Sequence, residues 1–278
     1  MAIDLAGLKL KNPVMVASGT FGFGIEFEDL VDLNKLGAIV TKTVTIKPRK
    51  GNPQPRIVEV ENGMVNSIGL QNDGVEYFIK HYLPYLRRLK TSIIVNIAGE
   101  TVEEYAKAAA ALKDAKGIDA IEINISCPNV DKGCMVFGKD PGLTRDVISA
   151  VVDARRDAHL PIIAKLTPNV DDIVAIAKAA LDAGADIISM INTVQHTVKI
   201  PGMDRTLTGG LSGPAIKETA LRLIKLVTKN IDAPIIGMGG IMNAADAGQF
   251  FKAGANAIAV GTANFVDPKT ALKIIDEL

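Results

Sequence analysis

The sequence predicts an α/β protein built as a (β/α)8 TIM barrel, and three observations support this fold. Eight short apolar runs are spread along the 278 residues, nearly all of them stop at a polar residue or a glycine, and helical periodicity lies between most of them. Strand, polar end and helix, repeated eight times, is the pattern of such a barrel, whose usual length is about 250 residues. We therefore expect one domain over residues 1–278. Chemistry in this fold takes place at the carboxyl ends of the strands.

The expected barrel strands are the apolar runs themselves. In chain order they are Val14–Ala17, Ala38–Val40, Ile93–Val95, Ala120–Ile125, Ile162–Ala164, Asp186–Ile191, Pro234–Met238 and Ala257–Val260. Ahead of them, residues 2–12 predict a short hairpin around Gly7 that closes the bottom of the barrel.

The helices between the strands are predicted from capping residues and helix breakers. Thr101 begins a helix that reaches about Lys116, Thr144 caps 145–157, Asp171 opens 172–183 before Gly184, Pro214 lies in the first turn of a helix to about Lys229, Asn243 caps a helix to Lys252, and Asp267-Pro268 starts the last helix.

Two connections are too long for simple loops between a strand and a helix. Residues 43–73 hold two strand-like pieces, 56–60 and 64–66, and residues 193–212 form the second long connection. Both follow the carboxyl end of a strand, so we expect them to form a rim or lid over the mouth.

Composition excludes several classes of function. Hydrophobic residues make up 48% and charged residues 22%, and the 31 basic residues balance the 31 acidic ones. This balance gives no reason to expect a nucleic-acid partner or an electrostatic membrane anchor. No basic segment precedes an apolar stretch at the start, and no run of about 18 apolar residues occurs, so we expect a cytoplasmic protein.

Metal chemistry is not expected either. Cys127 and Cys134 are the only cysteines, too few for the four thiolates of an iron–sulfur cluster. His81, His159 and His196 share no spacing with a further ligand. The sequence therefore predicts no metal site.

Residues 120–129 are the densest polar segment. Alternation along a strand places Ile121, Ile123 and Ile125 toward the helices, and Glu122 and Asn124 toward the barrel axis. Burying such groups is costly unless they are hydrogen-bonded. Glu122 is expected in a polar layer of the barrel, whereas Asn124, nearer the mouth, is a candidate for function.

Lys42 and Lys165 follow the second and fifth runs and point toward the axis or mouth by the same alternation. One interpretation of Lys165 is an ion pair with Glu122, because lysine is rarely buried without a partner. The other is a cation held against an anionic ligand or against a cofactor that becomes anionic.

Glycines follow the last two runs, at Gly239-Gly240 and Gly261-Thr262. In barrels the loops after strands seven and eight commonly bind phosphate through backbone N–H groups. Tight turns also use glycine pairs, but two such sites at these strand ends favour phosphate binding. The absence of G-x-G-x-x-G and of a P-loop motif argues against a dinucleotide fold.

Cys127 lies just past the fourth run. Cysteine is more often a small core residue than a catalyst, but here it stands beside Asn124 and Asn129. An unperturbed thiol pKa of about 8.5 suits a general base near neutrality, whereas Cys134 is interpreted as a bystander. Five asparagines are expected on the same face: Asn66, Asn96, Asn124, Asn129 and Asn192. Their carboxamides could bind a planar, amide-bearing ligand such as a pyrimidine. The alternative for each is a structural role in a turn, where asparagine is common.

At these positions the sequence resembles the class 1 dihydroorotate dehydrogenases. The motifs that carry the resemblance are Thr41-Lys42-Thr43, residues 66–72 (NSIGLQN), residues 123–129 (INISCPN), residues 165–169 (KLTPN), Ile191-Asn192-Thr193, residues 209–214 (GGLSGP) and residues 237–241 (GMGGI). Residues 42–53 look like the B-type catalytic subunit. The resemblance covers nearly the whole chain.

The resemblance implies a set of roles. One FMN per chain would bind Ser18, Lys42, Thr43, Asn96, Asn124, Lys165, Ile191, Gly213, Gly239, Gly240, Gly261 and Thr262. The pyrimidine would touch Lys42, Asn66, Ile68, Gly69, Leu70, Asn124, Asn129, Asn192 and Thr193. Cys127 would remove the C5 proton of (S)-dihydroorotate while a hydride passes from C6 to flavin N5, which makes orotate for UMP synthesis.

The resemblance also implies a partner. A second subunit with FAD and a [2Fe–2S] cluster would pass electrons to NAD, in a heterotetramer around a homodimer of this chain. Residues 194–204 depart from the B-type pattern, which leaves the lid and the partner contact open. The alternatives are a fumarate-dependent A-type homodimer, another FMN barrel acting on a reduced pyrimidine or enone, and a non-redox barrel or inactive module that binds a phosphorylated ligand.

Overall fold

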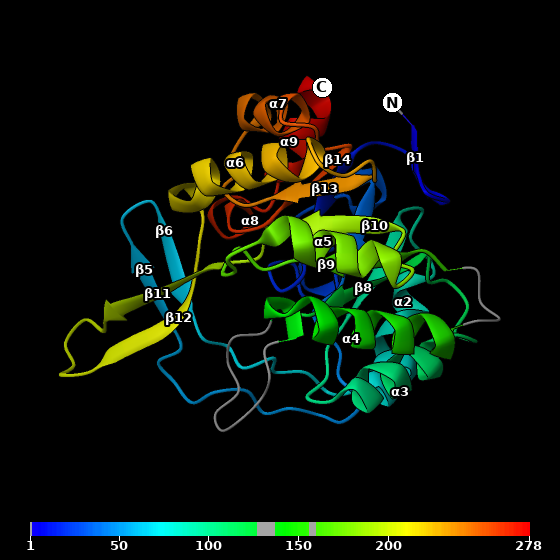
Figure 1. The fold of residues 1–278 in the computed structure, drawn as a ribbon. Helices are drawn as coiled ribbons and strands as arrows, with labels where there is room; N and C mark the ends of the chain where they lie inside the picture. The colour runs from blue at the N-terminus through cyan, green and yellow to red at the C-terminus, as the bar shows by residue number, and fades with distance from the viewer. Residues whose placement is uncertain (1, 127–136, 156–159) are drawn as a thin grey trace.

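A closed barrel of parallel strands forms the centre of the computed structural model, which describes residues 2–126, 137–155 and 160–278 (Figure 1). The barrel strands are β3 (Val14–Val16), β4 (Ala38–Val40), β7 (Ser92–Ile97), β8 (Ala120–Asn124), β9 (Ile162–Lys165), β10 (Ile187–Met190), β13 (Ile235–Met238) and β14 (Ala257–Val260). They pair in chain order, and β14 pairs with β3 to close the barrel. All eight predicted runs are therefore strands, and the predicted fold class is confirmed.

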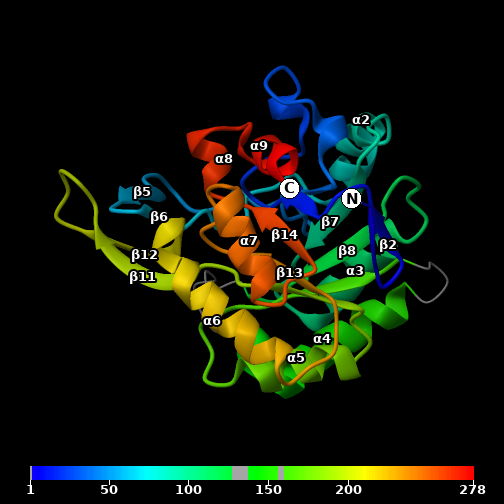
Figure 2. The same cartoon turned by 90° about the horizontal axis from the view of Figure 1, so that it is seen from above.

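Helices surround this barrel (Figure 2). The α-helices are α1 (Val75–Tyr77), α2 (Leu83–Leu86), α3 (Val102–Leu112), α4 (Pro141–Ala154), α5 (Ile173–Asp182), α6 (Lys217–Thr228), α7 (Ala244–Lys252), α8 (Ala263–Val266) and α9 (Thr270–Glu277). Short turns of other helical types are Ile25–Phe27, Leu33–Lys35, Phe78–Tyr82, Phe137–Lys139 and Pro214–Ile216. After β3, residues 17–37, which are all described, contain 3-10 turns and no α-helix.

Several helix starts and ends differ from the prediction. Thr144 does not cap α4, because Asp140 accepts the N–H of Leu143 at the N-cap and the Thr144 hydroxyl donates to Phe137 from inside the helix. An Asp-Pro start satisfies the first turn without Thr144. Helix α5 is capped by Asp172 rather than Asp171.

Two further ends shift by a few residues. Helix α3 ends at Leu112 instead of reaching Lys116, and α9 begins at Thr270, two residues past Pro268.

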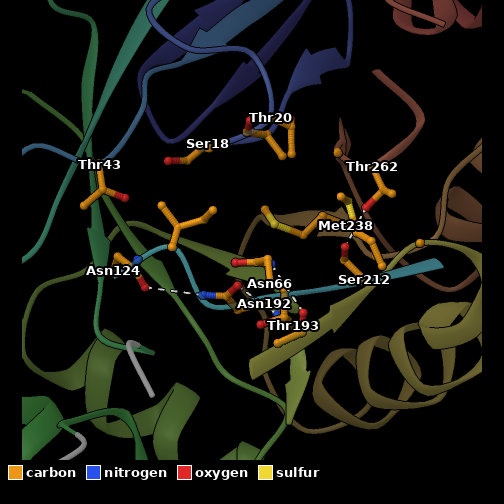
Figure 3. A pocket seen from close by; sticks show the side chains of 18 of the residues that line it. Ser18, Thr20, Thr43, Asn66, Asn124, Asn192, Thr193, Ser212, Met238 and Thr262 are labelled. Carbon is orange, nitrogen blue, oxygen red and sulfur yellow. Dashed lines mark hydrogen bonds between the residues drawn. The ribbon is translucent and has the colours of Figure 1, made fainter. Parts of the chain in front are cut away.

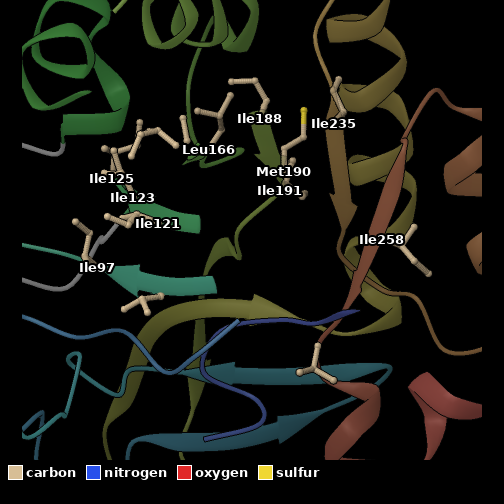
Figure 4. Packing of buried hydrophobic residues seen from close by; sticks show 14 of the residues in the cluster. Ile97, Ile121, Ile123, Ile125, Leu166, Ile188, Met190, Ile191, Ile235 and Ile258 are labelled. Atoms are coloured by element: carbon tan, nitrogen blue, oxygen red, sulfur yellow. The ribbon is translucent and has the colours of Figure 1, made fainter. Parts of the chain in front are cut away.

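The core has an outer and an inner part. Ile121, Ile123 and Ile125 are buried in the large cluster between strands and helices, as predicted (Figure 4). The inner part lies inside the barrel, where Ala120 and Ile163 meet leucines of the hairpin β1 (Ile3–Leu5) and β2 (Leu8–Leu10). The hairpin packs under the amino ends of the strands, since the Ser92 hydroxyl donates to the Lys9 carbonyl.

The two long insertions join in one antiparallel sheet that projects from one side of the barrel (Figures 1 and 2). Its order is β11 (Val194–Lys199), β12 (Thr206–Ser212), β6 (Gly63–Asn66), β5 (Ile57–Val60). Close approach requires glycine here, because a Cβ on Gly210 would lie 2.0 Å from Thr193 Oγ1. The predicted rim is confirmed, and its pairing into one sheet was not predicted.

Candidate functional site

A cavity of about 400 Å³ opens at the carboxyl ends of the barrel strands, beside the four-stranded sheet (Figure 3). This volume is within the range of small-molecule and cofactor sites. The predicted cofactor-binding residues that line it are Ser18, Lys42, Thr43, Asn124, Lys165, Ile191, Gly213, Gly239, Gly240, Gly261 and Thr262. The predicted substrate-binding residues that line it are Lys42, Asn66, Ile68, Gly69, Leu70, Asn124, Asn192 and Thr193.

Of the remaining predicted site residues, one is described away from the cavity and two are not described. Asn96 is fully buried in β7 and is not among the residues that line the cavity. Its amide nitrogen donates to Glu122 over 2.6 Å, and its amide oxygen has no hydrogen-bond partner among the described residues. Cys127 and Asn129 lie outside the described residues.

The carboxamides are held by the barrel ladder and by one another. Past the end of β10, the N–H of Ile191 donates to Met238 and that of Asn192 to Leu166, which fixes this segment against two neighbouring strands. The Asn192 amide then donates to Ser126 Oγ at 2.5 Å and to Asn124 Oδ1 at 3.4 Å. These amides are preorganised before a ligand binds, since little rotamer freedom is left to lose.

Two lysines bring positive charge to the cavity. Lys165 is 5% exposed, and its Nζ lies 3.5 Å from Glu122 Oε1, so the ion pair considered from the sequence is present in a residue that also lines the cavity. The pKa of Lys42 is lowered, first by burial and then by the charge of Arg56. Lys165 is placed to meet an anionic ligand with little competition from water, whereas Lys42 is only partly buried.

Glycines shape the cavity after β13 and β14. Gly240 has φ +85°, and a Cβ there would lie 2.9 Å from the Gly213 carbonyl oxygen and 2.8 Å from Lys217 Cβ. The Lys217 ammonium is paired with Asp246 at 2.8 Å, and Asp246 also accepts the N–H of Met242. The loop is thereby held close against α6, and its bare backbone suits a phosphate group.

Sequence reasoning missed several residues around the cavity. The Arg56 guanidinium donates to the Gln71 side chain, and both line the cavity from the first insertion. Thr262 donates to Ser212 Oγ over 2.8 Å, which connects the end of β12 to the segment after β14 (Figure 3). Ser212 and Gln71 each lie in a motif of the resemblance, GGLSGP and NSIGLQN, whereas nothing local marked Arg56.

The described residues contain neither a cluster of metal ligands nor a membrane-spanning helix. No group of three or more His, Cys, Asp or Glu side chains among residues 2–126, 137–155 and 160–278 could hold a metal ion. In the same ranges, no helix combines the length and the apolar character needed to cross a bilayer.

Comparison with known proteins gives matches along the full chain. The family model described as dihydroorotate dehydrogenase matches residues 1–278. A protein of Geobacter sp. (strain M21) is 50% identical over 100% of this chain and 92% of its own length. Proteins of Desulforamulus reducens and Alkaliphilus metalliredigens are each 52% identical over 99% of this chain and 91% of their own length. All three are named dihydroorotate dehydrogenase B (NAD(+)), catalytic subunit.

Proposed function

Since the chain belongs to the dihydroorotate dehydrogenase family, we propose that it is a B-type catalytic subunit, an oxidoreductase that converts (S)-dihydroorotate to orotate in pyrimidine biosynthesis. One observation carries this proposal. The family match runs through residues 1–278, and the described residues that the family resemblance assigns to ligands come together, except Asn96, around one cavity. About half of all positions are identical in relatives that have this name.

The described residues fit FMN as the resident cofactor. Gly239, Gly240 and Gly261 present bare backbone at the ends of the last two strands, where a phosphate would bind. On another side of the cavity, Lys165 and Asn124 offer a cation and a carboxamide to a polar ring system. FMN, when bound, supplies the acceptor for the hydride that leaves C6 of dihydroorotate.

The chain's own residues bind, orient and stabilise charge. Asn66, Asn124, Asn192 and Thr193 hold the pyrimidine amides through donors and acceptors set side by side. Lys42 faces the anionic part of the substrate. Lys165 would offset negative charge on a bound, reduced FMN, an electrostatic contribution that needs no rearrangement because Glu122 already holds the ammonium in place.

Cys127 is the proposed general base for the C5 proton. It lies outside the described residues, so its role rests on the sequence INISCPN and on family membership. A thiolate accepts a proton readily near neutral pH, because its unperturbed pKa is about 8.5. Asn129, also outside the described residues, stays a predicted substrate contact.

A partner subunit completes the proposal. The relatives are named as catalytic subunits of NAD(+)-linked enzymes. We propose that FAD and a [2Fe–2S] cluster are carried by a second subunit, in a heterotetramer around a homodimer of this chain, because the chain has two cysteines and no dinucleotide-binding motif. A cytoplasmic location stays a prediction.

The test is the absorption spectrum of the purified chain. We expect a yellow protein that bleaches when dihydroorotate is added without oxygen, and that reduces artificial dyes well but NAD poorly. Cys127→Ala should slow bleaching by roughly 10²–10⁴-fold, whereas Cys134→Ala should leave it unchanged.

A colourless chain would favour the phosphate-binding barrel, and faster bleaching by dihydrouracil would favour another FMN barrel. Efficient NAD reduction by the lone chain would contradict the partner, and rapid turnover with fumarate would favour the A-type enzyme.

A further inference from the structure

Four adjacent barrel strands each contribute one polar side chain to a cluster below the cavity. Glu122 of β8 lies at its centre and is 1% exposed. Its carboxylate accepts from Asn96 of β7 at 2.6 Å and from Ser189 of β10 at 2.8 Å, and it lies 3.5 Å from the Lys165 ammonium of β9. Asn96 and Ser189 are both 0% exposed.

This cluster has the hydrogen-bonding pattern of an ionised carboxylate. Each of the three neighbours presents a donor to Glu122, and an ionised carboxylate is an acceptor only. Burying such a group requires all of these partners, and a hydrophobic replacement of similar volume is often neutral or stabilising in other proteins. Stabilisation of the fold is therefore a weak explanation for a carboxylate inside the barrel.

Its position connects the carboxylate to the cavity. Glu122 is two residues before Asn124 on the same face of β8, and it contacts Lys165, which lines the cavity. The Asn96 amide nitrogen is occupied by Glu122, so its amide oxygen remains as a buried acceptor without a partner among the described residues. Glu122 thus orients two groups assigned to the cofactor and places a negative charge just beneath them.

We propose that Glu122 is a positioning residue that keeps the bound flavin hard to reduce. It fixes the Lys165 ammonium and offsets part of its charge, so that the reduced, anionic flavin is stabilised less than by Lys165 alone. This inference rests on the proposed function, because it assumes FMN in the cavity. A flavin that holds electrons weakly suits a subunit whose electrons end on NAD, itself a weak oxidant.

The experiment compares Glu122→Gln with the unchanged chain, both loaded with FMN and reduced slowly beside a reference dye of known potential. Glutamine keeps the shape and the acceptor oxygen but removes the charge. We expect the ratio of reduced to oxidised flavin at a fixed dye ratio to rise by about tenfold, from the loss of one charge near the flavin. Glu277→Gln, which removes a charge from an exposed position on α9, should leave that ratio unchanged.

Two further variants separate charge from shape. Glu122→Asp keeps the charge and should keep the ratio near that of the unchanged chain, while urea unfolding of the apoprotein should show a loss of stability. Ser189→Ala removes one donor from the carboxylate and should shift the ratio toward oxidised flavin. If Glu122→Gln fails to bind FMN, the result for Ser189→Ala decides whether the Glu122 carboxylate affects reduction of the flavin.

The proposal is overturned if Glu122→Gln lowers apoprotein stability without moving the ratio, if Glu122→Asp moves it as far as Glu122→Gln, or if Ser189→Ala leaves it unchanged or moves it toward reduced flavin. The dye equilibrium needs bound FMN but no dihydroorotate. A chain that shows the expected shifts and is not bleached by dihydroorotate would therefore refute the proposed function and leave this inference standing.

Discussion

At the amino end of the barrel the interior is hydrocarbon, whereas at the carboxyl end it is polar and charged. Leu5, Leu8 and Leu10 of the hairpin fill the first, together with strand residues such as Ile163 and Ile187. The second holds Lys165 and the carboxamides around the cavity. Strand β8 runs through both, since Ala120 belongs to the apolar layer, Glu122 to the polar cluster and Asn124 to the cavity wall.

The difference between the two ends shows how stability and chemistry share the same strands. Side chains two residues apart point the same way, so each strand can begin in a packed layer and end in a site. Within the barrel strands, the groups that a ligand must reach lie near the carboxyl ends, and the insertions add further cavity residues such as Asn66 and Thr193. Substitutions at the amino end should therefore change folding, and substitutions at the carboxyl end should change binding and rate.

Among the described residues, the largest effect is expected at Lys165. Lys165→Met removes the ammonium that faces the cavity and keeps most of the side-chain volume. We expect reduction of the bound flavin by dihydroorotate to slow by roughly 10²–10³-fold, the usual cost of removing one group that stabilises developing charge. Anaerobic stopped-flow absorbance measures this rate directly.

A double variant separates the two consequences of that substitution. Lys165→Met also leaves Glu122 without its ion-pair partner, which costs stability because a buried charge is then uncompensated. Adding Glu122→Gln should restore the urea midpoint but not the rate. Recovery of both together would mean that Lys165 acts through folding, and the contrast between the two ends would fail.

The next effect belongs to the amino end. Leu8 is 1% exposed in the hairpin layer. Leu8→Ala should lower the free energy of unfolding by about 2–4 kcal/mol through lost burial and the cavity left behind. Urea unfolding measures this change, and the reduction rate per bound flavin should not change. A slower rate in the folded, loaded variant would show that the hairpin controls the geometry of the mouth.

Much of the barrel could be predicted because its rules are local. An apolar run that ends at a polar residue marks a strand, and alternation alone placed Glu122 and Ile123 on opposite faces, as the structure confirms. The same alternation brought Lys42 and Lys165 to the cavity, because neighbouring parallel strands end at the same level. Their binding roles stay predictions.

The remaining features depend on contacts between distant segments. Nothing local indicates that Asn66 and Gly210 pair in one sheet, or that Arg56 reaches Gln71 beside the cavity. Asn96 was expected at the cavity, but one more layer of the barrel separates it from the mouth, where its amide meets Glu122. How far a strand residue lies from the mouth of the barrel depends on the register between strands, which cannot be read from the sequence alone.

A smaller effect is expected in the glycine loop after β13, which we propose binds the phosphate of FMN. Gly240→Ala places a Cβ within 2.9 Å of the Gly213 carbonyl oxygen at φ +85°. We expect FMN to bind about tenfold more weakly, because the loop must shift by a few tenths of an ångström and an L residue is strained there. Flavin fluorescence on titration measures the affinity. Gly248→Ala is the matched control, since nothing lies within 4 Å of its added Cβ in α7.

The smallest effect should come from Tyr82, which lies in neither interior. It stacks on Phe23, and burial, followed by its hydrogen bond to Asp73, raises its pKa to about 12. The unfolded tyrosine loses its proton near pH 10. The native state therefore keeps a proton that the unfolded state releases, and stability falls as pH rises from about 10 to about 12. Urea unfolding measures this loss. Between pH 7 and alkaline pH, Tyr82→Phe should lose less stability than the unchanged chain does. An unchanged slope of stability against pH would show that Tyr82 does not contribute to the pH dependence of folding.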